Sequence, residues 1–133
     1  MQQTTVVMVE PQPLVREGFS LIISAVEDIR IVAQGASLAD APTLVARHRP
    51  DVLCLSVRLT DGDARDVTAT IRELREPAPY IVLLTGRKDA PLVDSLRISD
   101  GVRVLSKYAP PEEIIETIRQ VGHSVRRSMR AAS

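Results

Sequence analysis

Short apolar runs alternate with amphipathic stretches along the whole chain. The runs are rich in β-branched residues and leucine and are bounded by proline, glycine or acidic residues, the pattern of a strand and its turn. The predicted strands are Thr5–Val9, Arg30–Gly35, Val52–Ser56, Tyr80–Thr85 and Val102–Leu105. Four consecutive apolar residues in Val52–Leu55 suit a strand that is covered on both faces, as in a parallel sheet between two layers of helices.

The stretches between the strands carry apolar residues at helical spacing. In chain order the predicted apolar faces are Val15, Phe19, Ile22 and Val26, widened by Leu14, Leu21 and Ala25; Ala41, Leu44, Val45 and His48; Val67, Ile71 and Leu74; Leu92, Val93 and Leu96, in a weak helix from about Ala90 to Ser99; and Ile114, Ile118, Val121 and Val125, with Met129 as a further candidate. Pro13 and Pro111 suit the first positions of their helices, and Ser37 or Asp40, then Asp63, are candidate caps of the second and third. Five strands alternating with five helices predict a doubly wound α/β fold, with a five-stranded parallel sheet and no interior domain boundary.

The composition narrows the class of protein. At 133 residues the chain suits one domain, and its 17 basic and 17 acidic residues cancel. A neutral domain with only Phe19, Tyr80 and Tyr108 as aromatic residues is unsuited to binding nucleic acid by phosphate neutralisation or base stacking. The single cysteine, Cys54, lies inside an apolar run and is interpreted as a core residue. Because we find neither a secretory signal nor an apolar run of about 18 residues, we expect a soluble cytoplasmic protein with no membrane contact.

Four stretches of the chain together resemble one protein family. They are Val9–Gly18, Arg49–Leu55, Ile81–Thr85 and Leu105–Glu113, and they agree with the family in order and spacing. The family is the CheY-like receiver domain of bacterial response regulators, especially the LuxR/NarL-type transcriptional regulators that carry a helix-turn-helix after the receiver. The resemblance covers about residues 4 to 122. It implies a flavodoxin-like fold and a role in two-component signal transduction, or phosphorelay, in transcription regulation.

The chain departs from the family pattern at the residues that carry its chemistry. Receivers transfer a phosphoryl group to an aspartate at the end of the third strand. They hold Mg²⁺ with that aspartate, with the second of two acids after the first strand, and with a backbone carbonyl two residues past the acceptor. The matching positions here are Ser56, Pro11 and Arg58, while Glu10, Thr85 and Lys107 are retained and the aromatic switch residue is replaced by Val104.

These departures imply an atypical pseudo-receiver with no catalytic residue. Mg²⁺ is usually anchored by one or two carboxylates, and Glu10 is the only acid left, so we expect no Mg²⁺, no other metal and no cofactor. Lys107 is then predicted either to reach Glu10 or to bond the Ser56 hydroxyl and nearby carbonyls. Alternatively, the vacated pocket binds an anion or a small-molecule ligand. A further alternative is a phosphotransfer-competent receiver that uses Ser56 as its acceptor.

Other polar residues have plainer interpretations. His48 at a helix end is expected at the surface or its boundary, and His123 lies too far along the last helix to join it. Asp61 and Asp63 are interpreted as turn and cap residues rather than as a metal loop. The chain after Glu116 contains arginines but no acid, which favours the negative end of a helix dipole and equally suits the start of a linker.

The leading hypothesis is a non-enzymatic regulatory module. A dinucleotide-binding enzyme is disfavoured, because the first loop lacks the glycines of that fingerprint. We expect residues 1–122 to form the receiver-like domain, and residues 123–133 to form the end of the last helix and the start of a linker to an output domain absent from this chain.

The expected partners follow from the resemblance. They are a second copy of the chain and a sensor kinase or other regulatory protein, with DNA reached only through the absent output domain. The contact face implied by the family consists of the helix from about 90 to 99, the strand 102–105 and the last helix. Its mixed charges, Asp94, Arg97, Arg103 and Glu116, suit a polar homodimer contact.

Overall fold

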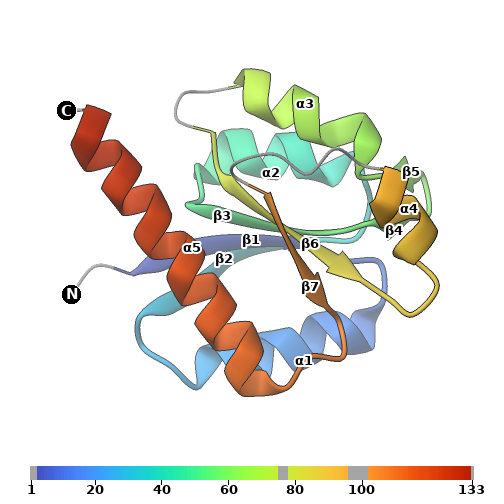
Figure 1. Ribbon diagram of the computed structural model, residues 1–133, viewed down its shortest axis with the longest axis horizontal. Coiled ribbons are helices and arrows are strands. Elements are labelled where there is room, and N and C mark those ends of the chain that lie inside the picture. Colours follow the sequence, from blue (N-terminus) through green and yellow to red (C-terminus); the bar gives the residue numbers. More distant parts are fainter. Residues whose placement is uncertain (1–2, 75–77, 96–101, 133) are drawn as a thin grey trace.

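The five expected strands form one parallel sheet in the computed structural model, which describes residues 3–74, 78–95 and 102–132 (Figure 1). They are β1 (Thr4–Val9), β2 (Ile29–Gly35), β3 (Val52–Ser56), β6 (Tyr80–Thr85) and β7 (Val102–Ser106), in the order β2-β1-β3-β6-β7. This confirms the predicted doubly wound fold. The loop expected after β3 contains one further feature, an antiparallel hairpin of β4 (Arg58–Leu59) and β5 (Gly62–Asp63).

Helices cover both faces of the sheet (Figure 1). The helices α1 (Pro13–Ser24) and α5 (Pro111–Ala132) lie on one face, and α2 (Asp40–His48) and α3 (Arg65–Leu74) lie on the other. The short helix α4 (Ala90–Ser95) lies beside the β4–β5 hairpin. The rest of the helix expected to reach Ser99, with Leu96 and Arg97, falls outside the described residues. None of the described helices is long and apolar enough to cross a bilayer.

The central strands are buried on both sides because their apolar runs feed two separate clusters. In β3, Val52 and Cys54 pack with α1 and α5, while Leu53 and Leu55 pack with α2 and α3. Successive side chains of a strand point to opposite faces, so an uninterrupted run serves both layers. Cys54 is a core residue, as predicted, and burial raises the pKa of its thiol to about 12.

The predicted inward faces of α1 and α2 need correction. Leu14 and Leu21, expected to widen the apolar face of α1, are 81% and 73% exposed, whereas Ile23 is buried beside Phe19. The expected Ala25 follows the end of α1 and is also exposed. The reason is that only a stripe about 100° wide on the surface of α1 can face the sheet. Phe19 and Ile23 occupy that stripe, so Leu14 and Leu21 point away from it.

On α2, Ala41 and Val45 are buried, but His48 in the last turn is exposed rather than inward-facing. The predicted caps of α2 also differ from the structure. The residue before the helix is Ala39, whose side chain makes no capping bond. The turn is instead fixed by two carboxylates: Asp40 accepts from the N–H groups of Ala36 and Ser37, and Asp61 accepts from those of Leu38 and Ala39.

Hydrogen bonds to the anionic form stabilise it, so these bonds lower the pKa of Asp40 and of Asp61. Asp61 is therefore a turn residue, as expected. The turn that it stabilises is the one before α2, however, and not the turn between β4 and β5 in which Asp61 itself lies. The N-terminal bond of α3 agrees with the prediction, because Asp63 accepts from the N–H of Arg65 at 3.0 Å.

Candidate functional site

The predicted site residues meet at the carboxyl ends of the strands. The strand order reverses between β1 and β3, since the chain leaves β1 toward β2 on one side and leaves β3 toward β6 on the other. Open α/β folds place their sites in the crevice outside such a switch point. Glu10 follows β1, Ser56 ends β3, Thr85 ends β6 and Lys107 follows β7.

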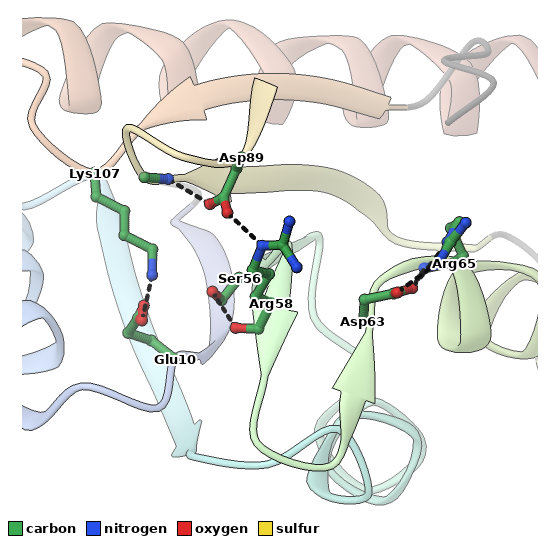
Figure 2. Close-up of polar contacts among 8 residues, drawn as sticks. Glu10, Ser56, Arg58, Asp63, Arg65, Asp89 and Lys107 are labelled. Carbon is green, nitrogen blue, oxygen red and sulfur yellow. Dashed lines mark hydrogen bonds and ion pairs between the residues drawn. The ribbon is translucent and has the colours of Figure 1, made fainter. Parts of the chain in front are cut away.

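The ammonium of Lys107 pairs with the carboxylate of Glu10 across this edge. Its Nζ lies 2.7 Å from Glu10 Oε1; the Glu10 side chain is fully buried and that of Lys107 is 10% exposed (Figure 2). Of the two partners predicted for Lys107, the structure therefore shows Glu10. Two hydrogen bonds to the backbone of the pair hold it in place: the Lys107 N–H donates to the carbonyl of Thr85, and the Glu10 carbonyl accepts from Arg16 Nη1 at 2.6 Å.

The hydroxyl of Ser56 turns back onto its own loop. Ser56 is fully buried and its Oγ donates to the carbonyl of Arg58 at 2.9 Å. In Figure 2 the serine lies between Glu10 on one side and the Arg58 side chain on the other. Pro11, directly after Glu10, is partly buried and brings no side-chain oxygen to the site. The Ser56 hydroxyl and the Arg58 carbonyl are thus hydrogen-bonded to each other within one short stretch of the loop.

A second ion pair at this edge was not anticipated from the sequence. Arg58 Nε lies 2.8 Å from Asp89 Oδ1, with the Arg58 side chain 59% exposed and that of Asp89 8% exposed. The other carboxylate oxygen of Asp89 accepts from the N–H of Gly86 at 2.6 Å. The turn residues Gly86 to Asp89 after β6 were a signal that polar groups gather here, but nothing in the sequence indicated Arg58 as their partner.

The remaining candidates lie at or beyond the rim of the site. The Thr85 hydroxyl donates to the carbonyl of Leu105 at 3.5 Å, and Val104 in β7 is 39% exposed. Asp63 pairs with Arg65, and the hydrogen bond from that side chain lowers the pKa of Asp63. His48 and His123 are both exposed, at the end of α2 and in α5.

Within the described part of the chain, no three histidine, cysteine, aspartate or glutamate side chains are grouped so that they could hold a metal ion. The site consists instead of two ion pairs that flank a buried hydroxyl. Two cations, Lys107 and Arg58, face two carboxylates, Glu10 and Asp89. The four side chains of the two pairs therefore carry no net charge.

Comparison with known proteins identifies the family. The response regulator receiver domain family matches residues 6–119 of the chain. Among curated proteins, the chain is 29% identical over 116 residues to the oxygen regulatory protein NreC of Staphylococcus epidermidis, which covers 87% of this chain and 53% of that protein. It is 27% identical over 129 residues to the transcriptional regulatory protein YxjL of Bacillus subtilis, covering 96% of this chain and 59% of that protein. The chain thus spans little more than half the length of these relatives.

Solved structures agree on the fold. The signal receiver domain of a response regulator NarL from Mycobacterium tuberculosis superposes with a TM-score of 0.80 at 24% identity, covering 92% of this chain and 98% of that one. A LuxR-family DNA-binding response regulator from Staphylococcus aureus gives a TM-score of 0.77 at 24% identity, covering 90% of this chain and 98% of that one. The family match over most of the chain leads to one conclusion: the chain belongs to the response regulator receiver domain family of two-component signalling.

Proposed function

We propose that this receiver domain works without aspartyl phosphorylation and without Mg²⁺, as a non-enzymatic module that regulates transcription through protein contacts. The observation that carries the proposal is the way the polar groups of the site satisfy one another. Lys107 is paired with Glu10, and the Ser56 hydroxyl is bonded to the Arg58 carbonyl. The acceptor aspartate and the second acid after β1, which the resemblance places at positions 56 and 11, are replaced by Ser56 and Pro11.

Ser56 is a poor substitute for an aspartate acceptor. Its hydroxyl is neutral, fully buried and engaged as a hydrogen-bond donor, and no described histidine or carboxylate accepts its proton. A nucleophilic hydroxyl needs an adjacent base to take up that proton. A serine phosphate is also an ester, which hydrolyses far more slowly than the acyl phosphate of an aspartate and would not reset on a signalling timescale.

The site does not fit Mg²⁺ either. This ion prefers octahedral oxygen coordination and keeps several waters, anchored by one or two carboxylates. Neither Ser56 nor Pro11 brings a carboxylate to the expected ligand positions, and the Oε1 of the remaining acid, Glu10, lies 2.7 Å from an ammonium group. The Arg58 carbonyl, the third expected ligand, accepts the Ser56 hydroxyl. Because phosphoryl transfer depends on cations that neutralise the developing charge, a site without the ion lacks most of that catalysis as well.

The output is proposed to pass through the face formed by α4, β7 and α5, here called the α4–β7–α5 face. Its described part combines partly exposed Val104 with the exposed side chains of Asp94 and Glu116, and Arg103 donates to Gln120 at 2.7 Å. A face that combines an exposed apolar residue with side chains of both charge signs suits a self-complementary contact between two copies. DNA would be reached only through an output domain, consistent with relatives of which the match covers only 53% and 59%.

The decisive test is chemical. The protein is incubated with Mg²⁺ and acetyl phosphate, and its intact mass is measured beside a receiver that has the usual aspartate, treated in the same tube. We expect the control to gain one phosphoryl group and this protein to keep its mass. A stoichiometric adduct that maps to Ser56 would replace the proposal with serine phosphotransfer. A change of the amide NMR spectrum with beryllofluoride and Mg²⁺ would show that the site still holds the ion.

A further inference from the structure

We propose that the ion pair between Arg58 and Asp89 is a latch that fixes the start of α4 against the end of β3, so that α4 is held in place with no phosphoryl group or metal ion. The inference rests on the proposed function, because it names what takes over the positioning in an unphosphorylated receiver. The two residues are 31 positions apart in sequence and come from different loops. Arg58 opens the β4–β5 hairpin, and Asp89 immediately precedes α4.

Asp89 makes hydrogen bonds to several parts of the loop after β6 and to its surroundings. Its carboxylate accepts from Arg58 Nε at 2.8 Å through one oxygen and from the Gly86 N–H at 2.6 Å through the other. Its backbone N–H donates to the Gly86 carbonyl, and its own carbonyl accepts from the Val93 N–H at 2.9 Å. A single residue therefore connects the turn and the neighbouring hairpin through its side chain (Figure 2) and the first turn of α4 through its backbone carbonyl.

Burial makes this pair different from an ordinary surface ion pair. Arg58 is largely exposed, but the carboxylate of Asp89 is 8% exposed and depends on its two hydrogen bonds. Removing a partner from a buried charged group leaves that group poorly solvated, which is costly. Without Arg58, the loop can restore the solvation of Asp89 only by opening toward water.

The short helix has few other attachments. The described part of α4 has six residues, too few to be stable as an isolated helix. Leu92 is its one buried apolar side chain among the described residues and packs into the cluster beneath α2 and α3. Among the described residues, α4 is therefore attached by Leu92 and the partly buried Val93 below it and by Asp89 at its start.

The latch is also connected to the centre of the site. The carbonyl of Arg58 accepts the Ser56 hydroxyl, while the side chain of the same residue holds Asp89. The backbone and side chain of Arg58 thus link the buried serine to the start of α4. Through this connection, a change at Ser56 is transmitted to the α4–β7–α5 face.

Hydrogen–deuterium exchange on the unphosphorylated protein tests the latch. In Arg58→Ala, we expect amides in residues 86–95 to exchange about tenfold faster, because a hydrogen bond to a charged group is lost and the segment opens more often. Arg65→Ala is the matched control: Arg65 is similarly exposed and pairs with Asp63, but that pair lies within one segment and does not bridge two loops. The control should leave residues 86–95 unchanged.

Further variants keep the test decisive. Arg58→Lys preserves the charge and should give exchange close to wild type, whereas Asp89→Ala, which removes the acceptor of both hydrogen bonds, should raise the exchange of residues 86–95 at least as much as Arg58→Ala. Wild-type exchange of residues 86–95 in Arg58→Ala, or an equal increase in Arg65→Ala, would overturn the latch. A urea unfolding curve for each variant confirms that the exchange is local. Because no phosphodonor is present, this outcome is independent of the mass measurement that tests the proposed function.

Discussion

At the scale of single residues, Glu10 is a tightly constrained group. It is fully buried, its Oε1 is paired with Lys107, and its Oε2 has no hydrogen-bond partner among the described residues. A buried charge is tolerated when its counter-charge is close and well aligned, and a charge that loses its partner is far more costly than a neutral pair of similar volume. The chemistry of this site therefore depends on Glu10 and Lys107 being present together.

Replacing Glu10 by Gln should strongly destabilise the fold. The ammonium of Lys107 would remain at 10% exposure without a counter-charge, and breaking such a pair typically costs about 3–5 kcal/mol in the free energy of unfolding. Urea denaturation followed by circular dichroism measures the loss. Lys107→Met should cost a similar amount, because it strands the carboxylate instead.

The double variant Glu10→Gln/Lys107→Met tests whether the loss of stability comes from breaking the ion pair or from poorer packing. Since neither charge remains, it should be more stable than either single variant. Losses that simply add in the double variant would mean that the two groups do not interact, and would contradict the pairing as a source of stability.

At the scale of elements, two glycines in helices show opposite constraints. Gly122 in α5 is buried where the helix crosses the start of β1, and a Cβ at that position would overlap the side chain of Thr4. Gly18 in α1 has no atom near its missing Cβ. Helical spacing predicted both helices, but it cannot distinguish a glycine required by close approach from one that is merely tolerated.

The two positions should respond oppositely to alanine. Gly18→Ala is expected to stabilise the protein by about 0.5–1 kcal/mol, because alanine is the better helix former and nothing obstructs its methyl group. Gly122→Ala gains the same propensity but must displace Thr4, and overpacking of this kind typically costs about 1–3 kcal/mol. Thermal unfolding of each variant shows whether its melting temperature rises or falls relative to the wild type. A stabilised Gly122→Ala protein would show that α5 can shift away from β1.

The elements that could be predicted are those that depend on local pattern alone. Tyr80–Thr85 was predicted with the bounds that the structure shows, because six consecutive strand-forming residues between a proline-rich break and a glycine leave no other interpretation. The outward position of Leu21 could not be read in the same way. Ile22, Ile23 and Leu21 are adjacent and equally apolar, and only contact with the sheet decides which of them faces inward.

The contacts of the site also divide into those that the sequence pattern predicts and those that it does not. Glu10 and Lys107 are 97 positions apart, yet their ion pair was one of the two predicted alternatives, because both residues follow strands at the same edge of a parallel sheet. The Arg58–Asp89 pair was missed because the direction of Arg58 depends on the β4–β5 hairpin. That hairpin in turn requires Gly62 at a φ of 151°, a conformation that other residues rarely adopt. Short turns of this kind leave little signal in a pattern of apolar residues.

At the scale of the whole molecule, the proposed homodimer contact can be located by comparing two of the exposed apolar side chains. One is Val104 on the α4–β7–α5 face, and the other is Leu21 on α1. The strand β7 is an edge of the sheet, and Val104 belongs to a face that also includes exposed charged side chains of α4 and α5, whereas Leu21 lies on the outer side of a helix that packs against β2 and α5. The mixed charges of the α4–β7–α5 face favour it for contact between copies.

A charge placed on each surface tells them apart. We expect Val104→Asp to weaken dimerisation by at least about tenfold in sedimentation equilibrium, because a buried unpaired charge at a contact costs more than about 1.4 kcal/mol. Leu21→Asp, with the same charge on a more exposed leucine, should leave the dimer unchanged. Dissociation by Leu21→Asp alone would move the contact to α1 and separate the dimer from the latch at α4. If only Val104→Asp dissociates the dimer, the contact lies on the face whose α4 is held by Arg58 and Asp89, so that Arg58→Ala should weaken the same dimer.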